Sequence, residues 1–261
     1  MPYPYLLFDA DNTLFDFDQA ERNAHLLLCR AHGLAFSEEG YQLYHKCNAD
    51  LWRDFDRGLC TKEYLLVERF RRYLAITGER ADPEALNRDH LRALGEGAML
   101  LPGAEELCRV LSRDHRLYLL TNAVASVQKA RFANSAIAPY FQGVFISEEV
   151  GVGKPDPAYF DYVFHAVPGL ARDNALVGVF ISDQIGAEKP APAFFDAVFA
   201  AIGPWKRGEV MLIGDSLTSD IQGANNAGLP CCWFNPKGQP RPQGLRIDYE
   251  IRALEELYAI V

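Results

Sequence analysis

The chain has 261 residues, of which 49% are hydrophobic and 23% charged. This composition is ordinary for a globular protein and leaves room for one large domain or two smaller ones. The net charge of −9 argues against a nucleic acid polymer or an anionic membrane surface as a partner. No window reaches the roughly 18 uninterrupted apolar residues of a membrane span, and no basic region precedes the short N-terminal apolar stretch. These features predict a cytoplasmic protein.

The cysteines support the same prediction. They lack the C-x-x-C spacing of metal or redox motifs, and two of them adjoin a Trp-Phe pair as in a buried strand. Packing thiols in a reducing compartment are therefore expected at Cys29, Cys47, Cys60, Cys108, Cys231 and Cys232. The six histidines show no metal-ligand spacing either.

The first chemical signal along the chain is an apolar run over residues 5–8 that ends at Asp9 and Asp11. Continuous apolar runs are typical of buried parallel strands, and ligand sites of open α/β sheets lie beyond the carboxyl ends of such strands. Two carboxylates at this place can act as a nucleophile or metal ligand and as a general acid or base. The pair therefore predicts an enzyme.

Residues 16–100 contain helical patterns without a good strand. Helices are predicted over 18–32, from Ser37, after Thr61, and from Asp82, where Pro83 follows the capping residue. Four helices inserted directly after the first strand predict a small helical cap. Aromatic residues of this segment are expected to form the core of the helical bundle rather than a platform for a base: Tyr41, Tyr44, Trp52, Phe55 and Tyr73.

From residue 101 onward, helical and strand patterns alternate. Strands are predicted over 117–121, 143–147, 210–214 and 231–234, with helices over 103–112, 124–136 and 219–227. Such alternation indicates right-handed βαβ units and a parallel sheet. The predicted fold is thus α/β, with a Rossmann-like core made of residues 1–15 and 101–261 and a four-helix cap over 16–100.

One segment of the core occurs twice in tandem, over residues 145–179 and 180–214. Each copy reads as a strand, a Lys-Pro pair and a helix, with the lysines at Lys154 and Lys189. Two copies are too few for a solenoid, so a duplicated βα unit is the better interpretation. Val179 occupies the position in the first copy that Asp215 occupies in the second, so the first copy offers no carboxylate there.

Three further segments could complete a site with Asp9. Thr121-Asn122 at a strand end offers a hydroxyl and an amide to phosphate oxygens, and a lysine beside Pro155 or Pro190 offers a cation. The strand over 210–214 ends at Asp215, with Asp220 close behind, and Mg²⁺ prefers such carboxylates. Taken singly, Thr121-Asn122 also fits a helix cap, each Lys-Pro pair a solvated loop, and the Gly-Asp segment a turn.

Together, Asp-x-Asp-x-Thr at the N-terminus and the late Gly-Asp-Ser-x-x-x-Asp resemble the haloacid dehalogenase-like phosphatase superfamily, in the order usual there. The resemblance covers essentially the whole chain. It implies Asp9 as the nucleophile that forms an aspartyl-phosphate, and Asp11 as the acid and base that serves the leaving oxygen and then the attacking water. It also implies Mg²⁺ bound by Asp9, Asp215 and the Asp11 backbone carbonyl, with Asp220 in support and Thr121 on the phosphoryl group.

More narrowly, Thr121-Asn122-Ala123-Val124 with Gln128 and Arg131 resembles the pyrimidine 5′-nucleotidase branch. Ala123 and Ala224 stand where that branch usually has glycine, changes that remove no catalytic group. The resemblance implies a phosphatase for a small phosphorylated metabolite, a pyrimidine nucleoside 5′-monophosphate first of all. Sugar phosphates and other small metabolites are the alternative within the superfamily.

The duplication leaves the choice of lysine and the integrity of the core open. Each lysine has a family-like spacing to one motif, Lys154 to the preceding Thr121 and Lys189 to the following Asp215. Lys189 is favoured because its predicted helix leads directly into the Gly-Asp strand. Lys154 is the competing copy.

An inactive binding protein, with a core disrupted by the duplication, is the alternative function of another class. A dehalogenase would not need Asp11 or Asp215, and a receiver domain would be about half as long and lack the cap.

Overall fold

A computed structural model describes residues 3–56, 59–121, 123–145, 192 and 209–261. The chain divides into two compact units, one made of Met1–Asp16 with Leu100–Val261 and the other of Phe17–Met99. The duplicated segment lies outside the described residues except for Phe145, Pro192 and 209–214, and so do Asn122, Lys154 and Lys189.

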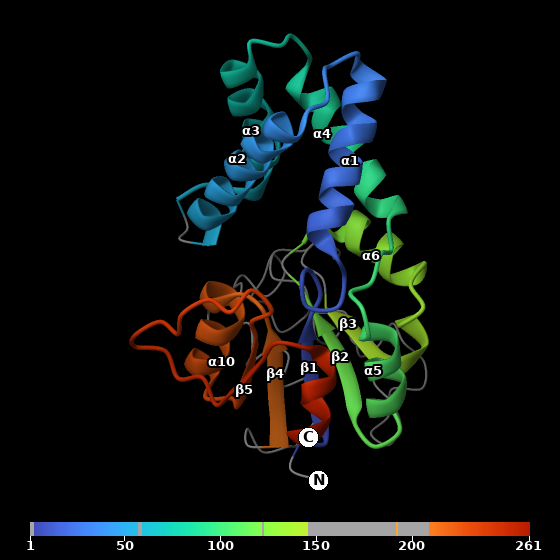
Figure 1. Cartoon of the computed structure of the whole chain (residues 1–261), viewed down its shortest axis with the longest axis vertical. Helices are drawn as coiled ribbons and strands as arrows, with labels where there is room; N and C mark the ends of the chain where they lie inside the picture. The colour runs from blue at the N-terminus through green and yellow to red at the C-terminus, as the bar shows by residue number, and fades with distance from the viewer. Residues whose placement is uncertain (1–2, 57–58, 122, 146–191, 193–208) are drawn as a thin grey trace, which may run out of the picture. The chain divides into compact units, whose positions relative to one another are not determined.

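The first unit is built on a parallel sheet, whose central strands are seen in Figure 1. In the described residues its order is β3-β2-β1-β4-β5-β6, and every pairing is parallel. The strands are β1 (Tyr5–Asp9), β2 (Arg116–Leu120), β3 (Phe141–Phe145), β4 (Val210–Gly214), β5 (Cys231–Phe234) and β6 (Tyr249–Ile251). The predicted α/β class with a Rossmann-like parallel sheet is confirmed.

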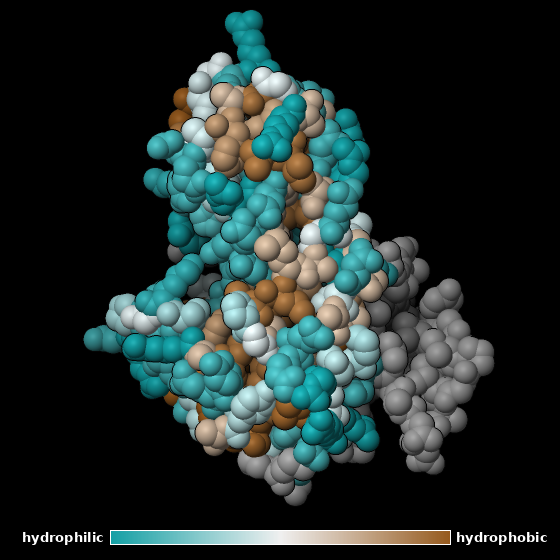
Figure 2. Space-filling view, turned by 45° about the vertical axis from the view of Figure 1, so that its right-hand side comes forward, coloured by the Kyte–Doolittle hydropathy of each residue, from teal (hydrophilic) through white to brown (hydrophobic). Residues whose placement is uncertain are grey.

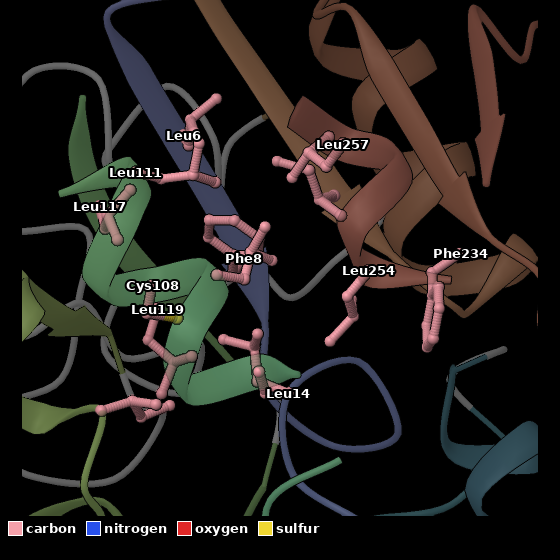
Figure 3. Close-up of a cluster of buried hydrophobic side chains, with 14 of the residues drawn as sticks. Leu6, Phe8, Leu14, Cys108, Leu111, Leu117, Leu119, Phe234, Leu254 and Leu257 are labelled. Carbon is pink, nitrogen blue, oxygen red and sulfur yellow. The ribbon is translucent and has the colours of Figure 1, made fainter. Parts of the chain in front are cut away.

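The central strands are buried on both faces. Successive side chains point to opposite sides of a strand, so one strand contributes residues to both cores. Leu6 and Phe8 face one core, which Cys108 of α5 (Ala104–Leu111) and Leu257 of the short helix Leu254–Ala259 also enter (Figure 3). Leu7 faces the other core, together with residues of the helical turn Leu217–Ile221 and of α10 (Gln222–Ala227). This two-sided burial explains why the strands read as continuous apolar runs.

Several elements differ from the sequence prediction. Strand β6 and the 3₁₀ helix Leu254–Ala259 were not predicted, since a three-residue edge strand and a six-residue 3₁₀ helix leave little periodic signal. The helix expected over 124–136 is α6, which is limited to Ala125–Ala133 and is followed by a 3₁₀ turn at Ala138–Tyr140. The helix expected from residue 219 begins earlier, with a π-helical turn at Leu217.

The second unit consists of α1 (Phe17–His32), α2 (Glu38–Asp56), α3 (Lys62–Thr77) and α4 (Pro83–Glu96). Thr61 caps α3 by accepting a hydrogen bond from the Tyr64 amide at 3.3 Å, and Asp82 caps α4 through the Glu84 amide at 3.1 Å. Trp52 and Phe55 are half-buried and pack edge to face on each other. The other three aromatic residues singled out in the sequence are core residues, in a cluster made of Leu28, Tyr41, Tyr44, Phe70, Tyr73 and Leu86.

The surface is a mosaic of polar and apolar residues on the face drawn in Figure 2. Within the described part of the chain, no helix combines the length and the apolar character needed to cross a bilayer. The cysteines resolved there are all free thiols, and five of the six are buried.

Candidate active site

Strand register brings the predicted site segments to one edge of the sheet. Asp9 pairs with Leu120 of β2, so Thr121 lies one residue beyond that pair. On the other side of β1, Phe8 pairs with Ile213 of β4, so Asp9 follows this pair directly and Asp215 follows it after Gly214. Strand order reverses between β1 and β4, since the chain passes from β1 to β2 and β3 before β4 returns beside β1. Ligands of open α/β sheets bind at such a switch point.

An acidic cluster lies at this switch point. One carboxylate oxygen from each of Asp9, Asp215 and Asp220 can be chosen so that all three lie within 4.8 Å of one another. Asp9 and Asp215 are half-buried, and Asp220 is fully buried. Hard carboxylate oxygens at this spacing match the donor chemistry that Mg²⁺ requires, so the residues present fit the expected cation.

The loop that carries Asp215 is fixed from two sides. The Asp215 amide donates to Thr13 Oγ1 at 3.1 Å, and Trp233 Nε1 donates to the Asp215 carbonyl at 2.9 Å. Thr13 and Trp233 are themselves buried, on the loop after β1 and on β5. Hydrogen bonds from two buried partners therefore set the position of the Asp215 backbone.

Asp220 is held against the end of β4. Its Oδ2 accepts a hydrogen bond from the Ser216 amide at 3.1 Å. A Cβ atom added to Gly214 would lie 2.4 Å from this same Oδ2, closer than real Cβ contacts allow. The glycine is thus needed for the close approach of the carboxylate to the strand.

Asp11 lies on a tight loop that directly follows β1. The Asn12 amide donates to the Phe15 carbonyl at 2.8 Å, and Asn12 takes a left-handed conformation with φ of 60°, which asparagine tolerates better than most residues. The Asp11 carboxylate does not belong to the acidic cluster found among the described residues. It pairs instead with Arg131 of α6, whose Nη1 lies 2.5 Å from Asp11 Oδ1.

Thr121 is almost completely buried at the end of β2, and its Oγ1 accepts a hydrogen bond from the Ala123 amide at 3.2 Å. The hydroxyl proton still gives this side chain a donor, since a hydroxyl donates and accepts at once. Helix α6 begins after Val124 without a side-chain cap. The register of β1 and β2 places Thr121 next to the residue that pairs with Asp9. Asn122 is outside the described residues.

Three residues of the site were missed as functional residues in the sequence: Thr13, Trp233 and Arg131. Thr13 was visible only as the last residue of the Asp-x-Asp-x-Thr motif, Trp233 only as a neighbour of two cysteines in a predicted strand, and Arg131 only as a feature shared with the nucleotidase branch. Their hydrogen bonds join residues far apart along the chain. Such pairs have no local sequence signal.

Comparison with known proteins identifies the family. A haloacid dehalogenase-like hydrolase model matches residues 3–168, and a HAD-hydrolase-like model matches residues 186–242. The chain is 34% identical over 259 residues to the HAD-hydrolase YfnB of Bacillus subtilis, covering 99% of this chain and 95% of YfnB. This chain belongs to the haloacid dehalogenase-like hydrolases.

Structure and further sequences agree with this membership. A crystal structure of YfnB bound to magnesium superposes on this hydrolase with a TM-score of 0.82 at 32% identity, covering 100% of this chain and 99% of that chain. The pyrimidine 5′-nucleotidases PynA of Streptococcus pneumoniae and YjjG of Escherichia coli are 31% and 29% identical, each over 98% of this chain and at least 94% of their own length. The prediction of an enzyme with phosphatase relatives of the 5′-nucleotidase type is thereby confirmed.

Proposed function

We propose that this hydrolase is a Mg²⁺-dependent phosphomonoesterase that works through an aspartyl-phosphate on Asp9. The observation that carries the proposal is the acidic cluster at the switch point, in which Asp9 shares one small volume with Asp215 and Asp220. A nucleophile beside a cation site meets the main demand of phosphoryl transfer, which is positioning and neutralisation of charge.

The two carboxylates of the first loop have separate roles. An oxygen of Asp9 attacks phosphorus in line with the leaving oxygen, and a P–O bond to Asp9 forms as the bond to the leaving group breaks. Asp11 gives its proton to the leaving oxygen. It then takes a proton from the water that hydrolyses the aspartyl-phosphate, which restores both carboxyl groups. The Asp11 side chain lies outside the acidic cluster found among the described residues, and this supports the division of labour.

For the cation, we assign Asp9, Asp215 and the Asp11 backbone carbonyl as ligands, with Asp220 in support. When bound there, Mg²⁺ neutralises charge on the transferring phosphoryl group. The magnesium-bound crystal form of YfnB, a protein 32% identical to this hydrolase, supports Mg²⁺ as the cation. Asp220 also holds the Ser216 amide, and so orders the loop that carries Asp215.

Thr121 and Asn122 are the proposed binding groups for the phosphoryl oxygens, completed by one lysine. Lys154 falls within the first family match and Lys189 within the second, so each copy has a family context. We favour Lys189, because the helix predicted after it from the sequence leads into the strand that precedes Asp215. Turnover of Lys154→Ala and Lys189→Ala distinguishes the two copies: the catalytic copy should lose several orders of magnitude. Equal small losses in both variants would contradict the assignment of either lysine.

As substrate we propose a pyrimidine nucleoside 5′-monophosphate, supported by the two nucleotidase relatives that match the chain over nearly their full length. A sugar phosphate is the second candidate, since a ribulose-1,5-bisphosphate 5-phosphatase of Halopiger xanaduensis is also similar, at 26% identity. The four-helix unit Phe17–Met99 is inserted between the strand of Asp9 and that of Thr121, and we propose that it acts as a cap that selects the leaving group.

The decisive experiment measures phosphate release from dUMP, dTMP and a panel of sugar phosphates, with Mg²⁺ and with a chelator, for the wild type and for Asp9→Asn. We expect Mg²⁺-dependent release that is fastest on the nucleotides and abolished in Asp9→Asn. Hydrolysis that persists in Asp9→Asn would exclude the covalent mechanism. A strong preference for sugar phosphates would replace the nucleotidase assignment, and a wild type without activity on the whole panel would favour the inactive binding protein.

A further inference from the structure

The proton-transfer group of the proposed reaction lies against a buried arginine. The Asp11 side chain is 24% exposed, whereas Arg131 is completely buried. Arg131 Nη1 lies 2.5 Å from Asp11 Oδ1, as in a charge-assisted hydrogen bond. The ion pair thus joins a partly exposed carboxylate to a cation that is fixed in the protein interior.

Arg131 also contacts the loop of Asp11 at a second point. Its guanidinium carbon lies 4.8 Å from the centroid of the Phe15 ring, and Phe15 is completely buried. Phe15 and Asp11 are joined by a backbone bridge, so both contacts fall on one short loop. A planar guanidinium suits this task, because it stacks on an aromatic ring and donates hydrogen bonds in its own plane.

The arginine itself is oriented by its own helix. Gln128 lies one turn before Arg131 on α6, it is fully buried, and its Oε1 accepts from Arg131 Nη1 at 3.3 Å. Burial of a charged side chain is costly, and a well-packed apolar residue of similar volume often stabilises a protein as well or better. Stability alone is therefore a weak reason for an arginine at this place.

We propose that Arg131 is the positioning residue for Asp11: it holds Oδ1 and leaves Oδ2 as the oxygen that exchanges the proton. This inference rests on the proposed phosphatase function. Arg131 touches neither substrate nor metal in this role and acts only through Asp11. Because the Arg131 guanidinium also packs on the Phe15 ring, one side chain fixes both the position of the Asp11 carboxylate and the conformation of the loop after β1.

Such a role has a kinetic signature that a structural role lacks. A nucleoside leaves as an alkoxide and needs the proton from Asp11, whereas p-nitrophenolate is a stable anion and needs it much less. Loss of Arg131 should therefore lower kcat/KM for dUMP far more than for p-nitrophenyl phosphate. The parameter kcat/KM is the right one to compare, since it reports steps up to release of the leaving group and excludes hydrolysis of the aspartyl-phosphate.

The experiment compares the wild type, Arg131→Lys and Arg131→Met on both substrates. General acid catalysis is worth about 10²–10⁴-fold, and we expect Arg131→Met to lose about 10- to 100-fold in kcat/KM on dUMP and about threefold or less on p-nitrophenyl phosphate. Arg131→Lys, which keeps the charge and one donor, should lose less. Equal losses on both substrates, or none, would overturn the proposal.

Two controls separate this outcome from other causes. Arg69→Met removes another buried arginine, which hydrogen-bonds Asn48 and Asn87 in the helical unit, and it should lower thermal stability without selectivity for the leaving group. In the background Asp11→Asn, Arg131→Met should cause little further loss in kcat/KM on dUMP, the substrate on which its loss in the wild-type background is large, because the group it positions is gone. Additive losses would contradict the proposal.

Failure of the proposed function is recognised separately, by a wild type that hydrolyses neither substrate. The inference about Arg131 is then decided by crystal structures of the wild type and Arg131→Met at matched pH. We expect the Asp11 carboxylate to change its rotamer or become disordered in the variant. An unchanged Asp11 side chain would overturn the positioning role, whatever the activity.

Discussion

At the scale of single residues, the acidic cluster depends on a glycine as much as on its carboxylates. Asp220 is fully buried against the end of β4, where Gly214 leaves the space for its Oδ2. Asp215 depends in the same way on Thr13 and Trp233, which hold its amide and its carbonyl. The positions of the proposed metal ligands are thus set by neighbours that carry no charge.

Gly214→Ala should therefore damage the proposed cation site without removing any of its proposed ligands. The added methyl group would overlap Asp220 Oδ2, and overpacking of this kind costs about 1–3 kcal/mol. We expect a lower free energy of unfolding in urea and a weaker Mg²⁺ affinity by isothermal titration calorimetry. Gly97→Ala is the matched control, since its Cβ would meet its nearest neighbour at an ordinary 3.7 Å. An unchanged affinity in Gly214→Ala would contradict this account of the glycine.

At the scale of elements, the helical unit buries two histidines in its aromatic core. His25 on α1 stacks on Tyr44 with ring centroids 4.7 Å apart, and His90 on α4 shares a 3.0 Å hydrogen bond between its Nε2 and the Tyr44 hydroxyl. Burial lowers the pKa of His25 to about 4. Burial also lowers the pKa of His90 well below its ordinary value, helped by the charges of Arg69 and His25.

These shifts predict that acid destabilises the helical unit. An unfolded histidine takes up a proton near pH 6.5, whereas folded His25 does so only near pH 4. The unfolded state therefore binds more protons over this window, and the free energy of unfolding falls as pH falls, by about 3 kcal/mol for His25 alone. His90 acts in the same direction.

Urea unfolding of the wild type and His25→Phe at a series of pH values from 8 to 4 tests this prediction. The phenylalanine keeps an aromatic ring in the stack but takes up no proton. Between pH 6.5 and pH 4, the free energy of unfolding of the wild type should fall more steeply than that of His25→Phe, by about 1.4 kcal/mol per pH unit. Above pH 7 the two curves should run parallel. Parallel curves throughout would show that His25 is not a source of the acid sensitivity.

At the scale of the whole molecule, the site exists because chain order and spatial order differ. The chain forms β1, leaves the sheet for the helical unit, returns to form β2 and β3, and only later places β4 on the free side of β1 (Figure 1). Asp9 and Asp215 thereby meet across the switch point although two hundred residues separate them. Three carboxylates packed this closely repel one another until a cation neutralises them.

Mg²⁺ should therefore raise the stability of the whole protein. A ligand at 100 times its Kd stabilises the folded state by about 2.7 kcal/mol, which for a protein of this size corresponds to a rise of roughly 5–10 °C in Tm. Calorimetry with Mg²⁺, or with a chelator and NaCl at equal ionic strength, measures this rise. Asp215→Asn relieves the repulsion, so it should unfold no earlier than the metal-free wild type yet respond little to Mg²⁺. A full response in that variant would exclude Asp215 as a ligand.

The sequence by itself determined the elements with a strong local pattern. Apolar runs identified β1, β2, β4 and β5, and capping residues at Thr61 and Asp82 identified the starts of two helices, because burial and capping leave their signal in adjacent residues. The motifs likewise indicated Asp9, Asp11, Thr121 and Asp215 as site candidates. Their catalytic roles remain predictions, and the choice between Lys154 and Lys189 lies outside the described residues.

Only the tertiary structure decided which partners these residues meet. Strand register and side-chain packing bring Arg131 to Asp11, and Thr13 and Trp233 to Asp215. They also leave the space at Gly214 that admits Asp220. Strand β6 depends in the same way on the neighbouring strand β5, with which it pairs. Hydrogen bonds and close contacts between distant segments are set by the geometry of the sheet, and a linear pattern of residues does not contain that geometry.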